Sequence, residues 1–90
     1  MLRYNQIMAK WFKVWNRSEY KEWALPTSYG YLLVIIRKQP KDYLLAKAKL
    51  IVKPKGLPLF ETLETKLILT EKKAIKQIDN WQTHALDKSP

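Results

Sequence analysis

The sequence predicts a single α+β domain: a small antiparallel β-sheet of about three strands, covered by an N-terminal and a C-terminal helix. Three observations lead to this prediction. Residues 31–36 are continuously apolar, as is typical of a central strand. Residues 39–42 have the composition of a tight turn, with Pro40 at its second position. Apolar residues recur every three or four positions from Ala74 to Leu86, which indicates a helix.

The first element expected is an amphipathic helix over residues 2–15. Its apolar side chains fall at helical spacing, namely Tyr4, Ile7, Met8, Trp11, Phe12 and Trp15. A strand over residues 10–16 is the alternative, because aromatic and β-branched residues favour strands. Trp11, Lys13 and Trp15 would then share one face, and Phe12 and Val14 the other. We prefer the helix, since it matches more positions over a longer window. A short turn is expected after Ser18, and Leu25-Pro26 is expected to end it. An edge strand before Gly30 is the alternative for this stretch.

The centre of the chain is a β-hairpin at residues 30–53 in this interpretation. Its first arm is the apolar run, and its second arm alternates small or apolar residues with lysine. Residues 43–53 also fit a helix with Asp42 at its N-cap, but the short proline turn favours the hairpin. A strand is expected at residues 63–69, and a helix capped by Thr70 at residues 71–86.

Composition and charge limit the class of protein. The chain has 47% hydrophobic and 28% charged residues, which is the composition of a folded domain, and it has no cysteine. The six-residue apolar run is too short for a transmembrane segment, and the N-terminus does not resemble a signal peptide, so we expect a cytoplasmic protein. The net charge is +9, and residues 26–57 supply +6 of it. Such a segment attracts polyanions, although lysine also protects exposed strands from pairing.

Motifs for catalysis are absent. Two glycines are too few for a phosphate-binding loop or a dinucleotide fingerprint. His84 is the single histidine, and with no cysteine to join it a metal site is not expected. Glu61 and Glu64 are best explained as part of a charge-balanced surface. We therefore expect neither an enzyme nor a cofactor.

The leading functional hypothesis is a binding module whose basic hairpin or sheet face contacts RNA or DNA. Such binding would be largely electrostatic. The basic candidates are Arg37, Lys38, Lys41, Lys47, Lys49, Lys53 and Lys55. The aromatic candidates are Trp11, Trp15, Trp23, Tyr29, Tyr31 and Tyr43.

The alternative hypothesis is a small accessory subunit that docks an acidic protein partner. It rests on the eight aromatic residues among the first 31, more than one small core hides easily. Association with a second copy or with another chain remains open on the sequence.

Overall fold

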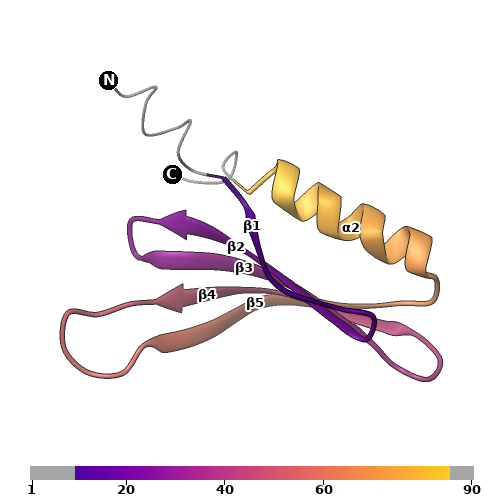
Figure 1. The fold of residues 1–90 in the computed structure, drawn as a ribbon, viewed down its shortest axis with the longest axis horizontal. Coiled ribbons are helices and arrows are strands. Elements are labelled where there is room, and N and C mark those ends of the chain that lie inside the picture. The colour runs from indigo at the N-terminus through magenta and orange to yellow at the C-terminus, as the bar shows by residue number, and fades with distance from the viewer. Residues whose placement is uncertain (1–9, 86–90) are drawn as a thin grey trace.

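The fold is a five-stranded antiparallel sheet followed by one helix, as described by a computed structural model for residues 10–85. The strands are joined in the order β1-β2-β3-β4-β5, so each strand pairs with its neighbours in sequence (Figure 1). The elements are β1 (Phe12–Arg17), β2 (Tyr20–Thr27), β3 (Gly30–Lys38), β4 (Tyr43–Ile51), β5 (Leu59–Ile68) and α2 (Glu71–Thr83).

The prediction of about three strands between two helices is wrong. Residues 12–15, the end of the predicted N-terminal helix, belong instead to β1, which pairs with β2 through partners such as Phe12↔Ala24 and Arg17↔Tyr20. The alternative reading of this stretch as a strand describes it better. Aromatic and β-branched side chains favour a pleated surface, and β2 offers a pairing partner that the sequence reading did not provide. Residues 2–9 of the predicted helix lie outside the described residues.

Strand β2 replaces the short turn expected before Pro26. The alternative of an edge strand before Gly30 describes this stretch better, although β2 lies inside the sheet between β1 and β3. Pro26 lies near the end of β2 opposite Tyr31 of β3. The ladder between β1 and β2 starts at Phe12↔Ala24, so Pro26 lies beyond the paired part of β1. Proline has no backbone N–H, but on the side of β2 that faces β1 this absence costs no hydrogen bond between strands.

The hairpin of β3 and β4 spans residues 30–51 and is the regular centre of the sheet. Its register runs from Lys38↔Tyr43 beside the turn to Gly30↔Ile51 at the other end. Gly30 has a positive φ of 143°, and a Cβ there would overlap the carbonyl oxygen of Leu50. Only glycine meets both requirements, which explains its position where β2 turns into β3.

Helix α2 packs on one face of the sheet and makes the main core. Ala74, Ile78 and Trp81 of the helix cluster with Val34, Ile36 and Leu45 of β3 and β4. The helix begins at Thr70, whose hydroxyl oxygen accepts a hydrogen bond from the Lys73 N–H at 3.3 Å. Figure 1 shows the helix on a single side of the sheet, and we call the opposite side the open face.

Candidate functional site

The register of the strands defines which side chains share the open face. Residues paired directly across antiparallel strands lie on the same face. Since Val34 and Ile36 contact the helix, the odd-numbered residues of β3 and their partners belong to the open face. From β1 to β5 they are Phe12, Trp15, Arg17; Tyr20, Glu22, Ala24, Pro26; Tyr31, Leu33, Ile35, Arg37; Leu44, Ala46, Ala48, Leu50; and Phe60, Thr62, Thr65, Leu67.

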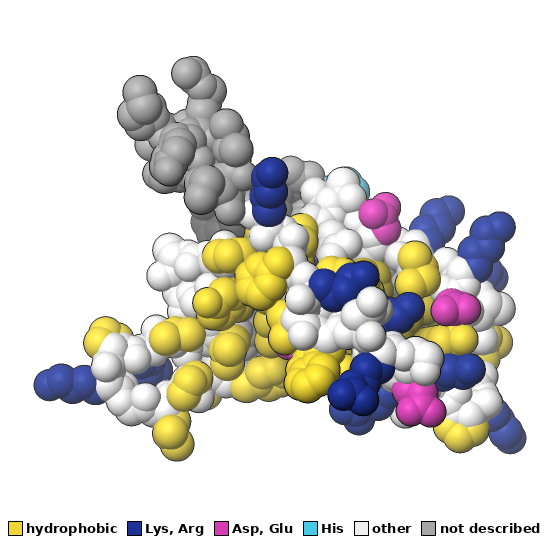
Figure 2. All heavy atoms as spheres, in the orientation of Figure 1, with side chains coloured by type: hydrophobic (Ala, Val, Ile, Leu, Met, Phe, Trp, Pro, Cys, Tyr) yellow, Lys and Arg dark blue, Asp and Glu magenta, His cyan; other side chains and the backbone are white. Residues whose placement is uncertain are grey.

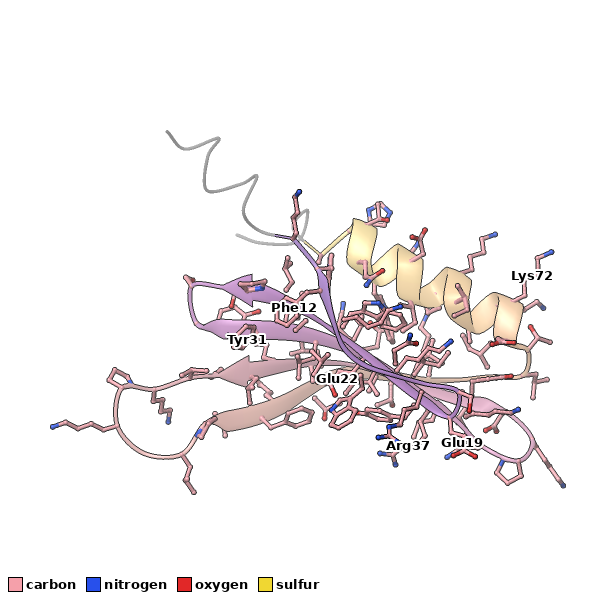
Figure 3. The ribbon with its side chains drawn as sticks, in the orientation of Figure 1. Phe12, Glu19, Glu22, Tyr31, Arg37 and Lys72 are labelled. Carbon is pink, nitrogen blue, oxygen red and sulfur yellow. The ribbon has the colours of Figure 1, made fainter. Side chains whose placement is uncertain are left out.

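Large aromatic rings are exposed at the two edges of the open face. Phe12 and Trp15 on β1 are 46% and 49% exposed, and Phe60 on β5 is 53% exposed. Tyr31 on β3 is half-buried, and its ring meets Phe12 edge-on with centroids 6.2 Å apart. Figure 3 shows these two side chains next to each other. The face therefore offers aromatic surface to a ligand without any rearrangement of the fold.

The centre of the open face is apolar. Ala24, Leu33 and Ala48 are buried there, and Ala46 beside them is half-buried. Figure 2 shows that hydrophobic side chains gather over the sheet, whereas Lys and Arg gather toward one end of the molecule and at the tip of the loop at the other.

Two arginines lie at one end of the open face and stack on aromatic rings. The Arg17 guanidinium lies 5.6 Å from the Trp15 ring centre, and that of Arg37 lies 5.6 Å from the ring centre of Tyr20. Both distances are within the range of cation–π attraction. Arginine held this way keeps its donors free for an anionic group such as phosphate.

Tyr20 and Glu22 make a neighbouring polar pair. The Tyr20 hydroxyl donates a hydrogen bond of 2.8 Å to Glu22 Oε1. Burial of the phenol, and secondarily the hydrogen bond and negative charge of Glu22, raise the pKa of Tyr20 to about 12, against a small opposing effect of Arg37. Tyr20 is therefore a neutral donor at neutral pH, and its pKa lies too high for it to act as a base there.

The basic residues selected from the sequence do not form one patch. Arg37 is on the open face, whereas Lys38, Lys47 and Lys49 are on the side of the sheet that carries α2. Lys41 lies in the turn between β3 and β4. Lys53 and Lys55 lie in the loop between β4 and β5, at the opposite end of the sheet (Figure 1).

Two of these lysines have partners within the fold. Lys47 is 3.8 Å from the carboxylate of Glu64 and lies over the Trp81 ring at 5.7 Å. Lys49 lies over the Tyr29 ring at 5.1 Å. Both charges are thus engaged within the fold, although each side chain remains partly accessible.

The aromatic candidates are divided between the two faces. Trp15 and Tyr31 lie on the open face. Trp11, Trp23 and Tyr43 pack against the core under α2, where the Trp11 ring N–H donates to the carbonyl of Gln82 at 3.1 Å. The sequence reading did not select Phe12, Phe60, Arg17 or Tyr20. Of the two interpretations of residues 10–16, only the strand could indicate Arg17, because a strand that continues to Arg17 places it on the same face as Trp15.

The described part of the chain shows no site for a metal. Within residues 10–85, no group of three or more His, Cys, Asp and Glu side chains is arranged to bind one. His84 is the C-cap of α2, where its backbone N–H donates to the carbonyl of Asn80 at 3.0 Å.

Comparison of the chain with protein families, with curated proteins and with solved structures finds no match. Among residues 10–85, no helix has the length and apolar character needed to cross a bilayer.

Proposed function

We propose that the open face binds single-stranded nucleic acid, with bases stacking on its aromatic rings. The observation that carries the proposal is the exposure of Phe12, Trp15 and Phe60 on the same face as Arg17 and Arg37. Aromatic rings on a sheet stack bases regardless of sequence, and arginine contacts the phosphates between them.

The charge of the whole chain supports an anionic ligand. The net charge is +9, and Lys41 and the pair Lys53 and Lys55 mark opposite ends of the strands. A single-stranded nucleic acid bound along the open face would have its phosphate backbone near these lysines. Counterion release would then make the affinity fall with added salt.

A single strand fits this face better than a duplex. In duplex DNA the bases are stacked on one another, and a protein reads them with an element that enters a groove. The helix α2 packs on the opposite side of the sheet, with Ala74, Ile78 and Trp81 in the core. The exposed rings require unstacked bases, which a single strand provides.

The first test is a fluorescence-anisotropy titration with labelled single-stranded RNA, single-stranded DNA and duplex DNA at several salt concentrations. We expect both single strands to bind more tightly than the duplex. Trp15→Leu and Phe60→Leu keep apolar area but remove the ring, and each should weaken single-strand binding roughly tenfold, within the range of stacking energies. Trp15→Phe and Phe60→Tyr are the matched controls and should retain most of the affinity. Equal affinity for Leu and aromatic variants would contradict base stacking.

A second candidate function is that of an accessory subunit that covers the open face with an acidic protein partner. It is favoured by Leu67 on the same face, which is 66% exposed and carries no polar group to read a base. A protein partner would tolerate leucine at positions 15 and 60, because aliphatic side chains also bury apolar area. The same variants therefore separate the two functions.

A further inference from the structure

Strand β5 is an uncovered edge of the sheet. It pairs with β4 along its ten residues, and no other described element pairs with its second side. All side chains of β5 are exposed except those of Glu64 and Ile68, which are half-buried. Leu67 has 66% of its surface exposed. An edge of this length offers free N–H and C=O groups to another strand.

The other edge of the sheet is protected. Strand β1 has six residues, an irregular register between Lys13 and Trp15, and basic side chains at Lys13 and Arg17. Short length, bulges and charge are the features that prevent edge pairing. In β5 the irregularity falls at Leu63, and residues 64–68 run in regular register against β4. The regular part of β5 is therefore the segment suited to a further strand.

We propose that β5 pairs in antiparallel fashion with β5 of a second copy of this chain, about a two-fold axis opposite Thr65. Two identical antiparallel strands are related by a two-fold axis perpendicular to the sheet, so the axis must pass opposite one residue that faces its own copy. The possible registers are therefore few and can be compared one by one.

Charge selects the register. An axis at Glu64 would place two carboxylates opposite each other, and an axis at Lys66 would do the same with two ammonium groups. Like charges directly opposite are destabilising. With the axis at Thr65, Glu64 of each copy faces Lys66 of the other, twice by symmetry, and the threonines face each other. Glu64 and Lys66 also lie 3.8 Å apart within one chain, so the pairing adds a second partner to each of these charges. Opposite charges and threonine pairs are both favourable cross-strand partners.

The apolar residues agree with this register. Two leucines lie two positions on either side of Thr65: Leu63, where β5 departs from regular register against β4, and Leu67. Leu63 of each copy therefore lies near Leu67 of the other. They are 43% and 66% exposed in the single chain. Pairing would cover both, which gives an apolar contribution beside the backbone hydrogen bonds.

The two-fold axis also fixes the arrangement of the faces. Because it is perpendicular to the sheet, the two α2 helices lie on the same side, and the two open faces form one continuous surface. The pairing depends on β5 alone and does not rest on the proposed nucleic-acid function.

The test measures the mass of the full chain in solution, without nucleic acid, by sedimentation equilibrium. Protein concentrations up to roughly 1 mM are needed, because short interfaces associate weakly. We expect the mass to rise with concentration from 10.7 kDa toward twice that value. Glu64→Lys and Lys66→Glu should each weaken the association roughly tenfold or more, because both cross-strand ion pairs become repulsive. Glu19→Lys, in the β1–β2 turn, and Lys72→Glu, on α2, are the matched controls and should associate as the unaltered chain does.

Mixing the two β5 variants gives the decisive result. In an equimolar mixture the lysines of one variant face the glutamates of the other at both positions, so association should recover. Circular dichroism of each variant alone checks that the sheet is intact. A mass that stays at 10.7 kDa at every concentration would overturn the proposal. The proposal would also be overturned if both variants associated as strongly as the unaltered chain. The same holds if the mixture of the two variants associated no more strongly than each variant alone.

Discussion

Tyr20 shows how single residues on the open face are tuned by their neighbours. Its hydroxyl is bonded to Glu22 at 2.8 Å, and Arg37 lies over its ring at 5.6 Å. Because the folded-state pKa of about 12 lies above the ordinary 10.0, the folded protein holds the phenolic proton more tightly than the unfolded chain does. The stabilisation linked to Tyr20 is complete below pH 10.0 and is lost as the pH rises through about 12.

Glu22→Ala should lower the pKa of Tyr20 without restoring the ordinary value, since burial is the largest cause of the shift. Ultraviolet absorbance of the phenolate measures the titration. The Tyr20→Phe variant identifies which ionisation step belongs to this residue. A pKa that does not fall in Glu22→Ala would show that the hydrogen bond to Glu22 is absent in solution.

We expect Lys47 to stabilise the fold more than it contributes to ligand binding. It lies between Glu64 and the ring of Trp81, and its side chain is 15% exposed. Lys47→Met should cost about 1 kcal/mol of unfolding free energy through the lost cation–π contact and ion pair. Urea unfolding measures that loss.

The same variant should change nucleic-acid affinity less than Arg37→Gln, since Arg37 lies on the open face. A larger loss of affinity in Lys47→Met would place the binding surface on the helix side.

At the scale of elements, α2 is attached to the sheet by a narrow apolar stripe. Trp81 is 6% exposed within the core cluster, whereas Ile75 on the same helix is 41% exposed. Trp81→Ala should therefore cost about 3–5 kcal/mol of unfolding free energy, as large-to-small changes in a core do. Ile75→Ala, the matched control, should cost less than half as much. Similar losses for both would mean that the helix packs differently in solution.

The sequence predicted an element correctly where its apolar residues followed only one periodicity, that of a helix or that of a strand. The helix periodicity after Thr70 and the apolar run at residues 31–36 each fitted one structure well, and α2 and β3 lie there. The residues that fit both a helix and a strand are Trp11, Phe12 and Trp15, so only the pairing with β2 decides between the two structures. For β2 the sequence offers a strand only as an alternative to a short turn. Pro26 is tolerated there because it lies beyond the paired part of β1, and no local pattern contains that pairing.

At the scale of the whole molecule, the excess charge and the exposed aromatic surface lie in different places. The excess charge of residues 26–57 is visible in the sequence, but the fold distributes it: Lys41 lies at one end of the sheet, Lys53 and Lys55 lie at the other, and Arg37 and Lys38 point to opposite faces. The open face combines Phe12 and Trp15 of β1 with Phe60 of β5, which are far apart in the chain. Such a surface exists only once the strand order is known, so no motif in the sequence could indicate it.

Side-chain NMR during titration with a short single-stranded oligonucleotide tests the central claim most directly. The ring resonances of Phe12, Trp15, Tyr31 and Phe60 should shift as the ligand is added, because stacked bases lie against them. The ring of Trp81, which belongs to α2 and is buried against the sheet, should stay unchanged as an internal control. Shifts confined to α2 and the lysines beside it, with the open-face rings unmoved, would contradict the account.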